Sequence, residues 1–120
     1  MRSKIIENLF SRIRSYGEQD ENRRVMIYLL HHAVGFENAI PVAKVASVCE
    51  VKNSFVSNLV KKSRRKGYFI GGCSKGIFLI DTHQDGAVAL EYYNDMIEGL
   101  QVNQQKLKLL MTEQGWSTEY

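Results

Sequence analysis

Cysteine and proline are scarce in this 120-residue chain, which has two cysteines and one proline. Two cysteines cannot form the disulfide framework of a small secreted domain, so we expect Cys49 and Cys73 to be free thiols. A zinc site needs about four ligands at metal spacing, whereas the cysteines and the three histidines are scattered along the chain. We therefore expect no metal site and no cofactor.

Long apolar runs are also missing. No stretch approaches the roughly 18 apolar residues that span a bilayer. The basic start, Met1–Lys4, is followed after two isoleucines by the polar pair Glu7 and Asn8, which is not the pattern of a secretory signal. The composition, 44% hydrophobic and 24% charged, is that of an ordinary globular protein. We expect a cytoplasmic protein that has no membrane partner.

Acidic residues are missing from one part of the chain. Between Val51 and Ile80 there is no Asp or Glu, although the net charge of the whole chain is only +3. A segregated basic block is typical of a surface that binds a polyanion, because an ordinary solvated helix face mixes both signs. The basic residues of this block are Lys52, Lys61, Lys62, Arg64, Arg65, Lys66 and Lys75.

Apolar residues at helical spacing predict five helices. Gly17 is expected to end the first, Asp20 or Asn22 to cap the second, and Gly67 to cap the end of the fourth. Thr82 and Asp85 resemble a capping box that opens the last and longest helix. The expected helices are 3–16, about 22–35, 41–49, 53–66 and 83–112.

Two short apolar runs predict a β-hairpin. They are Tyr68–Ile70 and Ile77–Ile80, and we expect the glycine-rich segment Gly71–Gly76 to form the turn. The fold class is therefore mainly α with a small hairpin, that is, α+β. We expect a first domain over 1–82, a dimerisation helix over 83–112 and a frayed tail over 113–120.

Several segments carry a resemblance to a known family. They are Ile40–Ala46, Val51–Val56, Leu59–Val60, Arg64–Tyr68, Ile70 and Ser74–Leu79. Over about 24–82 the chain resembles the winged helix-turn-helix family, and it is most similar to the small winged-helix proteins of phages, prophages and archaeal elements. The resemblance implies binding of double-stranded DNA, with helix 53–66 in the major groove and the wing, 70–78, on the minor groove or backbone.

Two positions depart from the family pattern. Glu50 stands in the turn where the family often has glycine, and it fits there with a right-handed backbone, since a positive φ would cost about 1 kcal/mol. Ser63 stands late in the recognition helix where leucine is common, and we expect it to weaken the hydrophobic contact slightly.

The resemblance also implies which residues contact DNA. Asn pairs with adenine, Ser serves any base edge, and Lys favours guanine or phosphate. We expect Lys75 at the hairpin tip to be the wing contact. Phe55 either packs against the preceding helix or touches a thymine methyl group, and we favour packing. The expected base-facing residues are Lys52, Asn53, Ser54, Ser57, Asn58 and Lys61, and the expected phosphate contacts are Lys62, Arg64, Arg65 and Lys66.

The last helix carries a second pattern, in which residues recur in alternating steps of three and four. This is a coiled-coil seam over about three heptads, and it predicts a homodimer. The alternative is a long helix that packs on its own domain, against the first helix. The seam residues are Leu90, Tyr93, Ile97, Leu100, Gln104, Leu107 and Met111.

Patterns of enzymatic function are missing. The sequence has no phosphate-binding loop, dinucleotide motif or nucleophile elbow, and we expect no catalytic residue and no enzyme activity. The sequence favours a homodimeric regulator of transcription that binds double-stranded DNA. Two alternatives stay open: a winged helix that binds an acidic protein partner, and a replication or packaging accessory that binds DNA without sequence choice.

Overall fold

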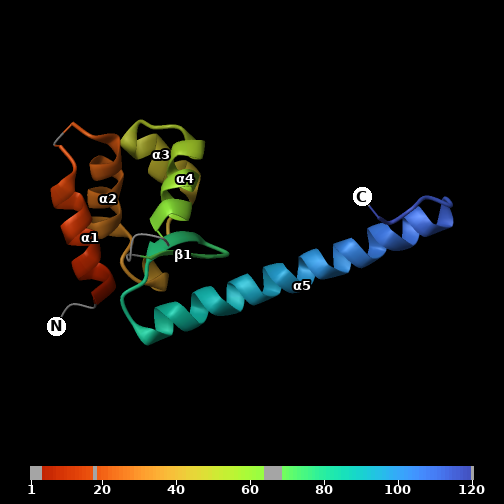
Figure 1. The fold of residues 1–120 in the computed structure, drawn as a ribbon. Helices are drawn as coiled ribbons and strands as arrows, with labels where there is room; N and C mark the ends of the chain where they lie inside the picture. The colour runs from red at the N-terminus through yellow and green to blue at the C-terminus, as the bar shows by residue number, and fades with distance from the viewer. Residues whose placement is uncertain (1–3, 18, 64–68, 120) are drawn as a thin grey trace. The chain divides into compact units, whose positions relative to one another are not determined.

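The computed structural model describes residues 4–17, 19–63 and 69–119. The protein is mostly helical, with a two-stranded antiparallel hairpin and a long last helix, which confirms the α+β class (Figure 1). The hairpin follows four α-helices, an order compatible with a winged-helix layout. The elements are α1 (Lys4–Ser15), α2 (Glu21–His32), the 3-10 helix η1 (Phe36–Asn38), α3 (Val42–Cys49), α4 (Asn53–Ser63), β1 (Ile70–Cys73), β2 (Gly76–Leu79) and α5 (His83–Glu113).

The chain divides into two compact units, residues 1–89 and 90–120. In the first unit the helices lie close to their expected bounds. The Asp20 carboxylate accepts a hydrogen bond of 2.7 Å from the Asn22 amide and so caps α2. The expected continuation of the second helix to Gly35 is wrong. α2 ends at His32, because the next residues leave the helix to bond with β2.

The hairpin differs from the expected one in its turn. β1 begins at Ile70 and includes both Gly71 and Gly72, which pair with Phe78 and Ile77. The glycine-rich segment is therefore mostly strand, and the turn between the strands is only Ser74–Lys75. Glycine was a misleading signal here, since strand pairing and packing fix these two residues.

The strand β2 forms backbone hydrogen bonds along both of its edges. On one edge it pairs with β1. On the other, Leu79 donates to Ala33 and accepts from Gly35, and Ile77 both donates to and accepts from Ile40, with N–O distances of 2.7–2.9 Å. β2 thus ties the end of α2 and the segment before α3 to the hairpin.

Two glycines of the hairpin are closely surrounded. A Cβ at Gly71 would lie 2.9 Å from Ile80 Cδ1, so the end of that side chain would have to shift. Gly76 has φ +137°, and a Cβ there would overlap the Ile40 carbonyl. Gly76 is therefore required, because it lets β2 approach the start of α3.

A single apolar core holds the first unit together. It includes the inward residues of α1 through α4 and both strands, so α1 is packed on α2 through Ile6, Leu9 and Ile13. Cys49 is buried in this core and burial raises the pKa of its thiol; it is a free thiol, as expected. The fully buried apolar side chains include Leu9, Val25, Met26, Leu29, Val45, Val56, Ile70, Phe78 and Leu79.

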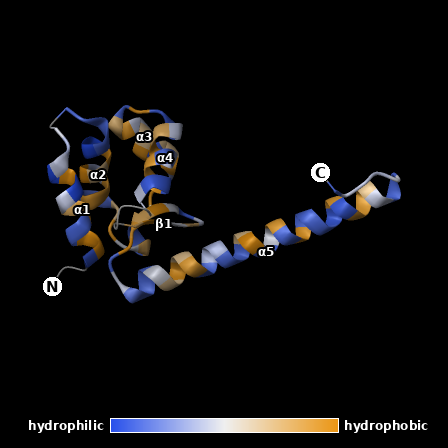
Figure 2. Cartoon of the chain, viewed as in Figure 1, coloured by the Kyte–Doolittle hydropathy of each residue, from blue (hydrophilic) through white to orange (hydrophobic). Residues whose placement is uncertain are grey.

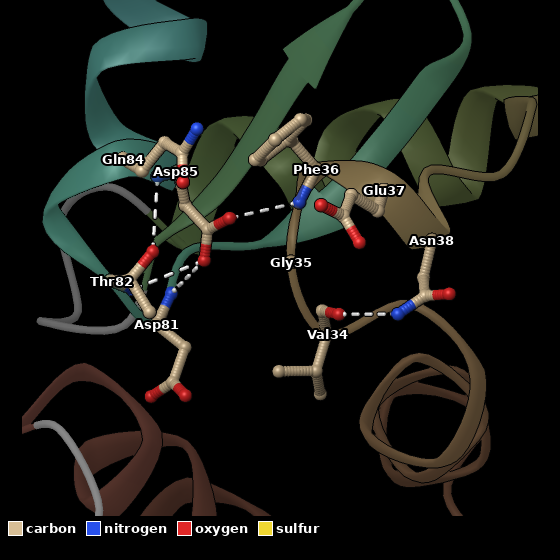
Figure 3. Close-up of a pocket in the computed structure, with 9 residues that line it drawn as sticks. All are labelled: Val34, Gly35, Phe36, Glu37, Asn38, Asp81, Thr82, Gln84 and Asp85. Carbon is tan, nitrogen blue, oxygen red and sulfur yellow. Dashed lines mark hydrogen bonds between the residues drawn. The ribbon is translucent and has the colours of Figure 1, made fainter.

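The carboxylate of Asp85 joins the start of α5 to the segment after α2 (Figure 3). It accepts hydrogen bonds from the backbone amides of Phe36 at 2.9 Å and of Asp81 and Thr82 at 3.0 Å. The Asp85 amide donates in return to Thr82 Oγ1 at 3.2 Å, which completes the expected capping box. The bond to Phe36 spans 49 residues and was outside the reach of the sequence pattern.

The Asp85 side chain is 3% exposed. Burial alone would raise its pKa, but the hydrogen bonds from Phe36, Asp81 and Thr82 favour the charged form and hold the pKa of Asp85 below its usual value. A carboxyl whose pKa is lowered by folding stabilises the folded state above its unfolded pKa. That stability is lost as the pH falls through the folded pKa.

Replacing Asp85 by Asn should therefore destabilise the protein by about 1–3 kcal/mol at pH 7, because amide donors lose a charged acceptor. The deficit should shrink as the pH is lowered from about 4 and the wild-type carboxyl is protonated. Urea unfolding between pH 2 and pH 7 measures this. Asp81→Asn is the matched control, since that side chain points away from the cluster (Figure 3). A deficit of D85N that is the same at pH 2 and pH 7 would contradict the charge argument.

The second unit contains residues 90–113 of α5. Hydrophobic and hydrophilic residues alternate along this helix (Figure 2). Three of its seam leucines are more than half exposed: Leu90 at 63%, Leu100 at 65% and Leu107 at 58%. Within the described ranges, no helix is long and apolar enough to cross a membrane.

Candidate nucleic-acid interface

The helix α4 has one buried face and one exposed face. Val56, Leu59 and Val60 are buried in the core, and α4 packs against α3 and β1. This burial fixes the rotation of α4 about its axis, because the apolar residues recur at helical spacing. The polar residues between them therefore lie on the opposite face.

The exposed face carries most of the residues expected to read bases. Asn53, Ser54, Asn58 and Lys61 are exposed and Ser57 is half-buried. Lys52, directly before the helix, and Lys62, in its last turn, are also exposed. From residue 53 to residue 61 this surface is about 12 Å long at 1.5 Å per residue, and a helix with its side chains, about 10–12 Å across, fits the width of the major groove.

The turn between α3 and α4 is built on a left-handed residue. Glu50 has φ 57° and ψ 45°, and its amide donates to the carbonyls at the end of α3. The expectation of a right-handed backbone at Glu50 is wrong. A left-handed glutamate costs about 1 kcal/mol or more, and the adjacent bond from the Val51 amide to the Ala46 carbonyl, 3.0 Å, helps to hold the turn closed.

Two acidic residues lie beside the proposed base-reading surface. Glu21, from the start of α2, and Glu50 line one shallow hollow together with Lys52 and Asn58. Neither was among the expected contact residues, because both lie outside the acid-free block and only the fold brings Glu21 to this place. Carboxylates repel phosphates, but they accept hydrogen bonds from the amino group of cytosine.

Ser63 joins the end of α4 to the start of the hairpin. It is fully buried, donates to the Val60 carbonyl at 2.6 Å and accepts from the Ile70 amide at 3.2 Å. The expectation that Ser63 merely weakens an apolar contact is wrong. The hydroxyl satisfies a buried backbone amide of β1, which a leucine cannot do.

The remaining expected contacts fall into three groups. Lys75 is exposed in the turn between β1 and β2, as a wing contact requires. Phe55 is half-buried and packs against the core, which confirms the favoured interpretation. The expected phosphate contacts Arg64, Arg65 and Lys66, the predicted helix end at Gly67 and the strand residue Tyr68 lie outside the described residues.

In the ranges that the structure describes, no three histidine, cysteine or acidic side chains gather in a way that could hold a metal ion. Comparison of the chain with family models, with curated proteins and with solved structures gives no match. What the protein binds is therefore inferred from the chemistry of its own surface.

Removing the Ser63 hydroxyl should weaken the connection between α4 and the hairpin. Ser63→Ala leaves the buried Ile70 amide without its acceptor, so we expect a loss of about 1–3 kcal/mol in the free energy of unfolding. Hydrogen exchange at Ile70 should also become faster. Ser47→Ala, an exposed serine of α3, is the control and should change stability by less than about 0.5 kcal/mol. Equal stability of the two variants would refute the role given to Ser63.

Proposed function

We propose that this protein binds double-stranded DNA as a winged helix-turn-helix regulator of transcription. α4 enters the major groove and the β1–β2 turn, with Lys75, contacts the minor groove or the backbone. The observation that carries the proposal is the exposed face of α4, which combines amide, hydroxyl and ammonium groups on a helix whose other face is anchored in the core.

The chemistry of this face supports direct reading of bases. Asn53 and Asn58 can each make a bidentate pair with adenine, and Lys61 can reach guanine or a phosphate. The side chains stand on a helix rather than on a loop, so they are held in fixed register, as sequence reading requires. Lys62 and Lys75 are suited to phosphates, which set the orientation on the duplex.

The regulator is proposed to act as a homodimer through the seam of α5. The exposed seam leucines form an apolar stripe of the kind that is buried by a partner. Two copies related by a two-fold axis would read a roughly palindromic site. The proposed partners are therefore DNA and a second copy of the chain.

A second candidate function is supported by the two carboxylates beside α4. Glu21 and Glu50 lower the positive charge around the hollow that Lys52 and Asn58 also line. A surface with both signs suits a protein partner better than a bare phosphate backbone. In this alternative the domain is an interaction module, and binding to DNA is weak at every sequence.

The first test is the salt dependence of DNA binding. If one copy neutralises about four phosphates, the logarithm of the affinity should fall with the logarithm of salt at a slope of about −4, and about twice that for a dimer. Fluorescence anisotropy with a labelled duplex at 50 and 200 mM salt measures the slope. If no duplex binds at 50 mM salt, DNA binding is excluded and the interaction module is favoured.

The second test separates base reading from phosphate binding. Asn58→Ala should cost about 1–3 kcal/mol on a selected site and little on random DNA, because it removes a contact to one base. Lys75→Ala should weaken both duplexes equally and reduce the salt slope by about 1. Lys44→Ala, an exposed lysine of α3, serves as the charge control. If N58A weakens selected and random DNA equally, α4 does not read sequence at this residue.

A further inference from the structure

The seam of α5 is bordered by two flanks of different character. In a heptad numbering that starts at Leu90, the seam residues occupy the first and fourth positions. One flank consists of the residues just before the first positions: Met96, Asn103 and Leu110. The opposite flank consists of the residues just after the fourth positions: Asn94, Gln101 and Lys108. Met96 is 49% exposed and Leu110 is 57% exposed. One flank is thus largely apolar and the other is entirely polar.

The flanks meet differently in the two possible orientations of a helix pair. In a parallel pair each flank faces the opposite flank of the partner, so Met96 would lie beside Gln101 of the second copy. In an antiparallel pair each flank faces itself. Met96 then meets Leu110 of the second copy, and the polar residues meet one another.

The charges of α5 also differ between its two halves. The first half of residues 90–113 carries Glu91, Asp95 and Glu98, and the second half carries Lys106, Lys108 and Glu113. Most of these residues lie at the outer heptad positions, so their charges act between the halves of the helices and not through direct contacts. A parallel pair sets the acidic half of each helix level with the same half of the other. An antiparallel pair sets it level with the half whose net charge is +1, from two lysines and one glutamate.

From these two independent patterns we infer that α5 forms an antiparallel pair with a second copy of this chain. The inference rests on the dimer of the proposed function and adds its orientation. Tyr93 packs on Met111 of the second copy, Ile97 on Leu107, and Leu100 on Gln104. The two-fold axis crosses the helices near Val102, and Lys106 comes level with Glu98 of the second copy.

This orientation fixes the spacing of the two ends. With the axis near residue 102, the two copies of Ala89 lie about 39 Å apart along the helices at 1.5 Å per residue. Successive major grooves on one face of DNA lie about 34–36 Å apart. An antiparallel pair therefore holds its helix ends at about the spacing of two half-sites.

Distances between spin labels test the orientation without DNA. Glu91, Gln105 and Thr112 are exposed and occupy the same heptad position, so single labels there differ only in their place along the helix. The antiparallel pair gives axial separations of about 33, 9 and 30 Å respectively, at 1.5 Å per residue. A parallel pair gives the same short separation at all three. The labels are placed on cysteines introduced into a Cys49→Ala, Cys73→Ser chain, whose folding is checked by circular dichroism.

Three results would overturn the inference. One is equal label distances at the three positions, which identifies a parallel pair. Another is a mass by light scattering other than twice 13.8 kDa. The third is an unchanged mass for the variant Leu100→Lys with Leu107→Lys, which should be a folded monomer if the seam is the interface. These measurements contain no DNA. A parallel pair or a monomer would therefore refute this inference without changing the outcome of the DNA-binding tests above.

Discussion

The first unit depends on β2 having backbone partners on both edges. A two-stranded hairpin is marginal in water by itself, but here Ile77 and Leu79 also bond to Ile40, Ala33 and Gly35. These bonds fix where α2 ends and where α3 begins. The hydroxyl of Ser63, at the end of α4, accepts a hydrogen bond from the first residue of β1, so the end of α4 is held to the same hairpin. The orientation of the proposed base-reading face thus follows from a few backbone bonds at the centre of the fold.

Much of this arrangement is readable from local sequence. The helices follow from apolar spacing, and the caps at Asp20 and at Thr82–Asp85 follow from side chains that bond within three residues. Such signals work because the partners are neighbours in the chain. The α+β class and the inward set of α4 follow from the same periodicity.

Several of the errors concern places where distant parts of the chain meet. Gly71 and Gly72 looked like a turn, but their positions are set by pairing with Phe78 and Ile77. Ser63 was expected to weaken an apolar contact, but its hydroxyl accepts a hydrogen bond from the amide of Ile70, seven residues later in the chain. Glu21 lies beside the candidate site only because α2 packs on α3. No periodicity encodes such contacts.

The close approach of Gly76 to the Ile40 carbonyl restricts how the hairpin can change in length. The strand beyond it is held on both edges, and any side chain at this position would separate the two segments. Residues added inside β1 or β2 would shift every pairing by one and turn core side chains outward. Within the hairpin, insertions are therefore best tolerated between Cys73 and Gly76. A longer or shorter turn, with a different reach, can evolve or be designed there while the pairing of both strands stays unaltered.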